Sequence, residues 1–479
     1  MIKSEGILKN FFSLTLSNII SQIITLFVTV YIANNFDPSG FGVINFSTVF
    51  ISYFMLISTL GLPSLGIIKA TKDPENTQKY VNQITSLRII LSVVALCILI
   101  VIVPFLNQTT EVKAMILING ITIFTSAVFI DWIFQALQKM SYVGFAALLR
   151  NVIYGIGVVV PLATGMYTKI YLVPIAQVVS SIIGCLFLWS IYRKQEKAKF
   201  KFDFNLKDAK ILVLAAVPFF FSGVFATFNS NIDILMIGIF KTKSDVGLYS
   251  AVYKIINILT IFVSFIFTPL YPYLIKYFHN KDYLSLDSLV AKLSKFVYIL
   301  AFPMLAGGLL LRENILLTLY SAEYYTEEVK LVYLVLIIQV FMLFGREIYG
   351  YELTAWGLQK KYMQIVMISS VYNIISNIIF IPMFGIVGAA VNTMISEIVN
   401  FILMRHFSRK TYIVKQDFSY IYGIIFATII MSSGIFLIKV FISKSILVLI
   451  PIGIVLYAIT ILVSRVLSKE EINYLLRKE

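Results

Sequence analysis

Charged side chains interrupt the long apolar segments of this 479-residue sequence, and each could hold an ion or a charged ligand. Three are cations: Arg150, Lys254 and Arg346. Four are acids: Asp131, Asp233, Glu352 and Glu397. An arginine can fork onto two phosphate oxygens and a lysine acts as a point charge, whereas a buried carboxylate can bind and release a proton or Na⁺. The cations therefore predict an anion-binding cavity, and the acids are candidates for coupling to a cation gradient.

Internal neutralisation is the alternative for these charges. Arg346 has Glu347 and Glu352 close by in sequence, and Lys254 could pair with Asp233. Arg150 has no acid near it in sequence, which makes it the better ligand candidate, although its position also suits a side chain that snorkels to the membrane surface.

Amide side chains recur at helical spacing within four apolar segments. Asn18, Gln22 and Thr25 follow an i, i+4, i+7 pattern, and similar stripes surround the other amides. The amides on these stripes are Asn18, Gln22, Asn229, Asn257, Asn373 and Asn377. Polar residues also hold membrane helices together, so packing is the alternative for each of them. Four stripes together favour the lining of a water-filled cavity.

The composition requires a membrane to position these residues. Hydrophobic residues make up 59% of the chain and charged residues 13%, against roughly 45–50% and about 25% in soluble domains. Apolar runs of about 20 residues recur, which predicts helices rather than the short alternating strands of a barrel. The longest strongly polar stretch covers only residues 193–210. A soluble catalytic domain therefore has no room, and no P-loop is present. We expect no enzyme activity, no metal site and no cofactor.

The segmentation predicts an all-α polytopic membrane protein with about 14 transmembrane helices. Their ranges are 10–34, 43–68, 86–106, 114–136, 142–163, 170–192, 211–239, 247–275, 294–311, 329–355, 362–381, 385–404, 419–438 and 445–466. Of the 39 Lys and Arg residues, 28 fall on the side of the two termini and 8 on the other. Because cytoplasmic loops carry the excess of Lys and Arg, both termini are predicted to be cytoplasmic. The net charge of +15 then needs no nucleic-acid partner.

Two internal echoes predict a duplicated bundle. FQALQK, which begins at residue 134, resembles AWGLQK, which begins at residue 355, and this match aligns Asp131 with Glu352. The connector 34–47 likewise resembles 238–251, with Gly42 aligned to Gly247. The expected organisation is a six-helix lobe over 1–200, a parallel six-helix lobe over 201–412, and two further helices with a tail over 413–479. Such repeats are typical of transporters, whose substrate path runs between the halves.

Three segments carry a resemblance to a known family. They are FDPSGFGVINFS after the first predicted helix, NIDILMIGIFKTKSDVGLYSAVYKI at the seventh and eighth, and LTAWGLQKKY after the tenth. They resemble the bacterial polysaccharide flippases, which belong to one superfamily with multidrug and toxin extrusion antiporters and lipid II flippases. The resemblance covers most of the chain. It marks the polysaccharide branch but names no sugar.

The resemblance implies a multi-pass protein of the bacterial cytoplasmic membrane that moves undecaprenyl-pyrophosphate-linked oligosaccharide repeat units for O-antigen, capsule or exopolysaccharide synthesis. It further implies alternating access, a cationic cavity, coupling to H⁺ or Na⁺, a role for Asp233 through its place in NIDILMIG, and a separate polymerase and length regulator as partners. We expect a monomer among membrane lipids. A multidrug or small-solute antiporter is the alternative within transport. The external connectors of this chain are too short for a membrane-embedded polymerase, and the polar stripes disfavour a non-transporting scaffold.

Overall fold

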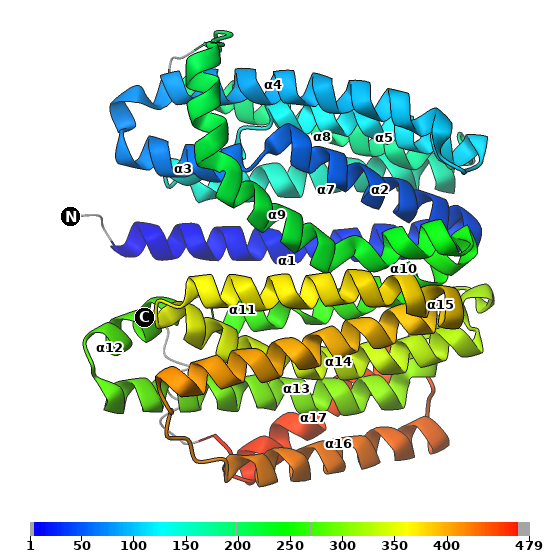
Figure 1. The fold of residues 1–479 in the computed structure, drawn as a ribbon. Coiled ribbons are helices and arrows are strands. Elements are labelled where there is room, and N and C mark those ends of the chain that lie inside the picture. Colours follow the sequence, from blue (N-terminus) through cyan, green and yellow to red (C-terminus); the bar gives the residue numbers. More distant parts are fainter. Residues whose placement is uncertain (1–3, 197–198, 268–269, 468–479) are drawn as a thin grey trace. The chain divides into compact units, whose positions relative to one another are not determined.

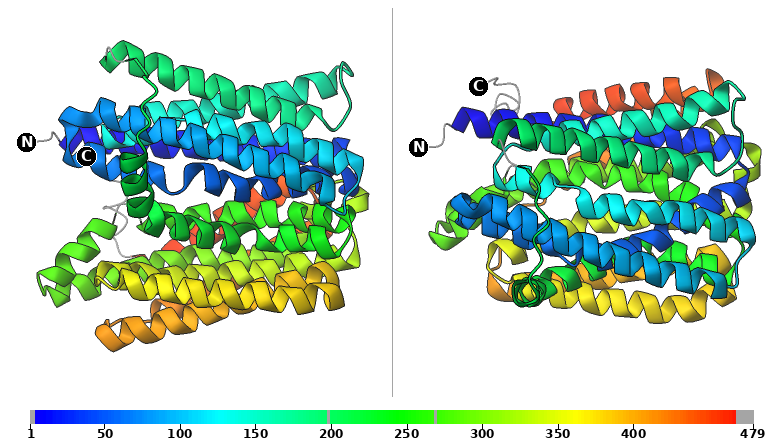
Figure 2. Two further views of the ribbon diagram at one scale, coloured as in Figure 1. Left: turned by 45° about the horizontal axis from the view of Figure 1, so that its top comes forward. Right: turned by 90° about the horizontal axis from the view of Figure 1, so that it is seen from above.

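The computed structural model describes residues 4–196, 199–267 and 270–467. Every regular element in these ranges is a helix, and eleven of the helical segments are long and apolar enough to cross a membrane. The prediction of an all-α polytopic membrane protein is therefore confirmed. In Figures 1 and 2 the long helices within each half of the chain run side by side.

The chain forms two compact units, Met1–Ser250 and Ala251–Glu479. The first unit contains α1 (Ser4–Asn35), α2 (Pro38–Thr59), α3 (Leu62–Lys72), η1 (Pro74–Asn76), α4 (Thr77–Ile102), η2 (Val103–Phe105), α5 (Thr110–Val128), α6 (Asp131–Ala136), α7 (Met140–Ala163), α8 (Leu172–Glu196) and α9 (Leu206–Phe240). Helix α10 (Lys243–Leu259) begins in the first unit and ends in the second. The lobe boundaries expected from the repeat stay a prediction.

The second unit continues with seven helices and one short 3₁₀ turn. They are α11 (Ile261–Phe267), α12 (Tyr271–His279), α13 (Tyr283–Leu319), η3 (Ala322–Tyr324), α14 (Glu327–Ala355), α15 (Gln359–Thr411), α16 (Tyr420–Phe441) and α17 (Ile446–Val463). The predicted span 247–275 covers most of α10, all of α11 and the start of α12, so it is interrupted after Leu259 and again before Tyr271. Its residues 268 and 269 lie outside the described ranges.

Side-chain caps mark where several helices begin. Asp37 accepts the backbone N–H of Gly40 at 2.6 Å at the start of α2, with Pro38 in the first turn. Asn205 accepts the N–H of Lys207 at 2.9 Å at the start of α9. Such caps satisfy backbone donors that have no partner within the helix. Polar connectors therefore delimit helices that the apolar runs alone locate only roughly.

The predicted helix 43–68 is two helices, because α2 ends at Thr59 and α3 begins at Leu62. Leu60 and Gly61 between them have left-handed backbones, with φ of 45° and 70°. A Cβ on Gly61 would lie 2.6 Å from the backbone nitrogen of Phe220 in α9. Glycine thus permits both the turn and the close approach of α9, which in Figure 1 crosses the first unit obliquely.

Helix α15 joins the two predicted spans 362–381 and 385–404 across a kink. Gly385 has φ of 61° and ψ of −142°, a conformation that side-chain-bearing residues rarely adopt. Pro382, three residues earlier, lacks the N–H that an uninterrupted helix needs there. The segment is thus two helical arms, Gln359 to Phe384 and Ile386 to Thr411.

Candidate functional site

A break in the predicted helix 114–136 is the structural centre of the first unit's charged residues. Phe129 and Ile130 separate α5 from α6 inside a candidate membrane span, Thr110–Ala136. The last carbonyls of α5 consequently lack intrahelical donors, and lipid cannot supply any. Side chains of neighbouring helices must do so.

Arg88 of α4 supplies two of these donors. Its Nη1 donates to the carbonyl of Phe129 at 3.0 Å and its Nη2 donates to the carbonyl of Ser126. The sequence did not single out this residue, because the helix predicted over 86–106 placed Arg88 in its first turn and its charge was counted with those of the basic connectors. Helix α4 in fact begins at Thr77, so Arg88 lies three turns inside it and is 3% exposed. A helix start placed in the polar stretch before residue 82 would have put Arg88 well inside the helix.

Two side chains of α8 complete the set. Trp189 Nε1 donates to the carbonyl of Val128 at 2.9 Å, and Cys185 Sγ donates to the carbonyl of Thr125 at 3.2 Å. A tryptophan and a cysteine at this spacing gave no sequence signal, because both read as ordinary packing residues of an apolar run. The broken end of α5 is thereby held by two helices.

Arg150 of α7 lies against the same break. Its guanidinium carbon is 5.0 Å from the centroid of the Phe129 ring, a cation–π arrangement. Gly184 of α8 leaves room for its stem, since a Cβ there would lie 2.6 Å from Arg150 Cγ. The Arg150 Nε is buried and has no hydrogen-bond partner within the described residues.

Asp131, the first residue of α6, brings a negative charge to this group. It interacts electrostatically with the guanidinium groups of both Arg88 and Arg150. Its Oδ2 accepts a long hydrogen bond of 3.4 Å from Gln135 Nε2. The structure thus joins two of the predicted site residues, Asp131 and Arg150, with the unpredicted Arg88. Two cations against one carboxylate make a site that favours an added anion.

Arg346 of α14 is internally neutralised, which is the alternative that the sequence left open. It forms an ion pair with the neighbouring Glu347, and its Nε lies 3.0 Å from Oε2 of Glu397 in α15. Both Arg346 and Glu397 are buried. The sequence suggested Glu347 or Glu352 as the partner; Glu397, 51 residues along the chain, is brought there by the fold.

Glu352 instead accepts a hydrogen bond from Ser408 Oγ, and both residues are buried. Arg409 is the cation that interacts electrostatically with this carboxylate. Glu352 lies at the end of α14 and Ser408 at the end of α15, so the contact joins these two helix ends.

Turn geometry changes the predicted alignment of Asp131 with Glu352. The left-handed residue after α6 is Gln138, and the one after α14 is Gly357. The Leu137 N–H donates to the Ile133 carbonyl, and the Trp356 N–H donates to the Glu352 carbonyl. By this geometry Glu352 corresponds to Ile133 and not to Asp131.

Hydrogen bonds between side chains join the two arms of α15. They involve Asn373 and Asn377, which were predicted from the sequence to line a cavity. Asn377 Nδ2 donates to Asn373 Oδ1 at 3.0 Å, and Asn392 Nδ2 donates to Asn377 Oδ1 at 2.9 Å. Asn373 Nδ2 in turn donates to Ser396 Oγ at 3.3 Å. All four residues are buried. This geometry is that of the packing alternative, because the amides hold the two arms together across the kink.

The remaining predicted residues differ in exposure. Gln22, Asn229 and Asn257 are exposed, and Lys254 is half-buried. Asp233 is buried and accepts a hydrogen bond from Tyr249 Oη at 2.8 Å, so it has a partner other than Lys254. The side chain of Asn18 lies outside the described part of the structure.

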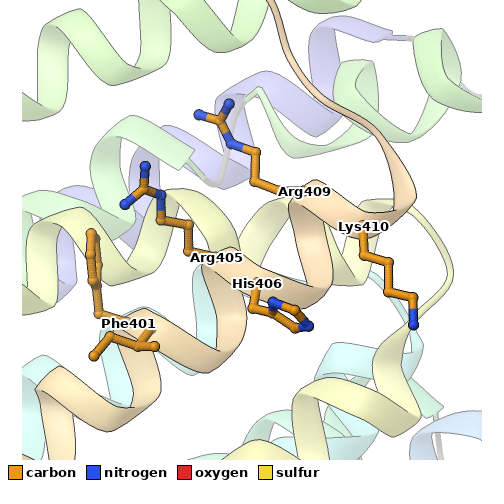
Figure 3. A pocket seen from close by; sticks show the side chains of 6 residues that line it. Phe401, Arg405, His406, Arg409 and Lys410 are labelled. Atoms are coloured by element: carbon orange, nitrogen blue, oxygen red, sulfur yellow. The ribbon is translucent and has the colours of Figure 1, made fainter.

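A cationic pocket of about 470 Å³ lies at the end of α15. It is lined by Phe401, Ile402, Arg405, His406, Arg409 and Lys410. Figure 3 shows Arg405 and Arg409, one turn apart, extending to the same side of the helix, while His406 and Lys410 extend elsewhere. Arg409 and Lys410 lie in the last turn of α15, where positive charge is also favoured by the helix dipole. The pocket could bind an anion between the two guanidinium groups.

Comparison with known proteins places this geometry in a family. Residues 7–278 match the family described as polysaccharide biosynthesis protein. A probable low-salt glycan biosynthesis flippase of Haloferax volcanii is 26% identical over 253 residues, which is 52% of this chain and 52% of that one. The chain thus spans about half the length of this relative. A capsular polysaccharide biosynthesis protein of Staphylococcus aureus is 20% identical over 84% of this chain and all of its own length.

Solved structures show the same fold. A lipid II flippase in an inward closed conformation superposes with a TM-score of 0.77 at 18% identity, covering 97% of this chain and 99% of that one. An inward-facing multidrug resistance transporter superposes with a TM-score of 0.65 at 11% identity, covering 82% and 96%. The matching family model covers more than half of the chain, and the membrane fold agrees with it. The chain belongs to the polysaccharide biosynthesis protein family.

Proposed function

We propose that this protein is a flippase that moves undecaprenyl-pyrophosphate-linked oligosaccharide repeat units across the bacterial cytoplasmic membrane for surface polysaccharide synthesis. The family, the names of the two relatives and the fold shared with a lipid II flippase support this proposal. The protein would act by alternating access as a transporter and not as an enzyme. Its substrate class is a lipid pyrophosphate with a polar glycan.

The observation that carries the proposal is Arg150. A charge inside a membrane span costs about 2.5–3.5 kcal/mol on insertion scales and is expected to face a partner or water. The Arg150 guanidinium lies over the Phe129 ring and interacts with the Asp131 carboxylate, which also interacts with Arg88. Its Nε lacks a protein acceptor within the described residues. A pyrophosphate supplies acceptors in the fork geometry that a guanidinium prefers.

Two further cationic positions fit the same substrate. The Arg405–Arg409 pocket would receive the pyrophosphate at the basic side of the membrane, and Lys254 would contribute a point charge. The pairing of Arg346 with two glutamates makes it a poorer ligand, so we leave it out of the pyrophosphate site. The glycan would accept and donate hydrogen bonds at exposed amide side chains, namely Gln22, Asn229 and Asn257, and at Asn18.

Coupling to a proton or Na⁺ gradient is proposed through the buried carboxylates. Glu352 is the leading candidate, because its partners among the described residues are the Ser408 hydroxyl and, electrostatically, Arg409. Asp131, Asp233 and Glu397 are further candidates, of which Glu397 is already paired with Arg346. We further propose cytoplasmic termini, a monomeric carrier, and a separate polymerase and length regulator as functional partners.

A multidrug antiporter is the second candidate, favoured by the fold shared with a multidrug resistance transporter. The cations at Arg150 and in the Arg405–Arg409 pocket argue against it, because they would repel cationic drugs.

Deletion of the gene and measurement of the lipid-linked glycan in each membrane leaflet tests the proposal. A flippase predicts that repeat units accumulate on the cytoplasmic leaflet and that surface glycan falls, with both restored by the wild-type gene. Unchanged surface glycan together with raised drug sensitivity would favour the antiporter instead. Accumulation of single repeat units on the outer leaflet would indicate a polymerase.

A further inference from the structure

An apolar groove of about 670 Å³ runs over α4, α5 and α8 of the first unit. Helix α5 contacts both α4 and α8, and all three lie within candidate membrane spans. The groove walls include Ile121 and Phe124 of α5 and Ile182 and Leu186 of α8. Leu186 is 64% exposed, so the groove opens to the surroundings of the helices. Its volume lies within the roughly 300–1,000 Å³ range of small-molecule sites.

One end of the groove is polar and basic. Arg193, in the last turn of α8, lines it and is exposed. The groove here also contains Phe200, whose ring packs edge-on against Trp189 at 5.7 Å between centroids. An aromatic pair beside an exposed arginine is typical of the boundary between hydrocarbon and lipid headgroups.

We propose that this groove binds an acyl chain of an anionic phospholipid from the surrounding bilayer, with the lipid phosphate on Arg193. Hydrocarbon is the medium around these spans, so an acyl chain enters the groove from the bilayer without desolvation and gains van der Waals contacts with the groove walls. Arg193 selects among lipids because its positive charge complements a phosphate and a net negative headgroup. The proposal holds independently of the transported substrate.

The flippase substrate is the less suitable occupant. Its pyrophosphate and glycan need several donors, whereas Arg193 is the one arginine among the described residues that line the groove. Arg88 and Arg150 do not line it. The bound chain would instead act on the site indirectly, because Thr125 and Val128 both line the groove and offer the carbonyls that Cys185 and Trp189 cap at the helix break. Occupancy would therefore stabilise the broken end of α5.

The test uses the full-length protein in nanodiscs of phosphatidylcholine with small amounts of a photo-crosslinkable phosphatidylglycerol or phosphatidylcholine. Peptides of α4, α5 and α8 should be labelled by the phosphatidylglycerol probe about fivefold more than by the phosphatidylcholine probe, the preference expected from one basic residue at an anionic headgroup. Arg193→Glu should remove this preference. Lys360→Glu, the same charge change at an exposed site after α14, should leave it intact.

Leu186→Trp is a second variant, which narrows the groove without changing charge and should reduce labelling by both probes. Equal labelling by the two lipids, unaffected by Arg193→Glu, would overturn the proposal. Loss of phosphatidylglycerol labelling when undecaprenyl pyrophosphate is added would also overturn it and would identify the groove as part of the substrate path. Retained fluorescence-detected size-exclusion profiles exclude misfolding as the cause of any loss.

Discussion

Arg88 and Arg150 show how differently two arginines can act at one helix break. Arg88 donates from its Nη atoms to the backbone carbonyls of Ser126 and Phe129 at the end of α5, so its energetic role lies in folding. Arg150 stacks on Phe129, and we propose that its guanidinium binds a ligand. The Nε atoms of both arginines lack a partner within the described ranges, so the two residues differ in the carbonyls that the Nη atoms of Arg88 contact. In the sequence the two arginines carry the same charge and cannot be distinguished. In the structure the acceptors around each guanidinium distinguish them.

Substitution of Arg88 should therefore be a stability defect. Arg88→Ala leaves the Phe129 carbonyl without its donor in a membrane span and removes one of the two donors to the Ser126 carbonyl, so it should lower the free energy of unfolding by about 2 kcal/mol or more. Thermal unfolding in detergent and protein abundance in membranes measure this. Lys113→Ala, which removes a donor to the exposed Pro104 carbonyl where water can replace it, is the control and should change stability by less than about 0.5 kcal/mol. An Arg88→Ala protein as stable as the wild type would contradict the capping role.

Gly184 should act as a positioning residue for Arg150. In Gly184→Ala the new Cβ would lie 2.6 Å from Cγ and 2.7 Å from Cδ of Arg150, so the flexible stem must move while the fold is kept. Transport should fall by about tenfold, with a higher substrate concentration needed for the half-maximal rate, because the guanidinium is displaced. Gly223→Ala is the control, since its Cβ would meet only a side-chain atom of Leu56 at 3.5 Å. Unchanged transport by Gly184→Ala would remove Arg150 from the substrate site.

At the scale of elements, helix breaks are what the sequence predicts least well. Fourteen apolar runs are visible because length and hydropathy set them, and the Gly385 kink coincides with the first residue of the predicted span 385–404. The break at Phe129 and Ile130 is invisible, since both residues are apolar and the donors that satisfy it come from α4 and α8. For the same reason the sequence suggested the adjacent Glu347 as an ion-pair partner of Arg346, but not Glu397, which the fold brings from a distant part of the chain.

Replacing Gly385 by a residue with a side chain should lower the stability of the protein. A Cβ there meets nothing within 4 Å, so any penalty of Gly385→Ala comes from the backbone conformation and should be about 1–3 kcal/mol. Thermal unfolding provides the measurement. Gly307→Ala in α13, where the nearest atom is Met431 Cε at 4.0 Å, should be neutral or slightly stabilising. Equal stability of both variants would show that the two arms of α15 do not need the kink.

For the whole molecule, the distribution of basic residues predicts the orientation. With 28 of 39 Lys and Arg on the side of the termini, N- and C-terminal reporters should both be active only in the cytoplasm. Fusions to a fluorescent protein and to alkaline phosphatase measure this, with a fusion in the connector near Lys169 as the control of opposite location. A periplasmic signal from either terminus would invert the assignment of the Arg405–Arg409 pocket to the cytoplasmic side.

Two of the residues on which the predicted duplication rests are glycines that the backbone geometry requires. A Cβ on Gly42 would lie 1.6 Å from the Lys243 carbonyl oxygen, and one on Gly247 would lie 1.9 Å from the Pro38 carbonyl oxygen. These aligned glycines thus meet at the crossing of α2 with the start of α10. The Leu-Gln-Lys echo misaligned the acids by two residues, because three matching letters constrain a register less than the turn itself does.

Transport by the purified protein tests the central claim that Arg150 binds the pyrophosphate of a flipped lipid. Proteoliposomes containing a fluorescent undecaprenyl-pyrophosphate oligosaccharide report its movement between leaflets through quenching of the outer leaflet. The account predicts flipping by the wild-type protein, a loss of about tenfold or more in Arg150→Ala, partial recovery in Arg150→Lys, and equal abundance of all three. Flipping by Arg150→Ala at the wild-type rate, or none by any variant under proton or sodium gradients, would contradict it.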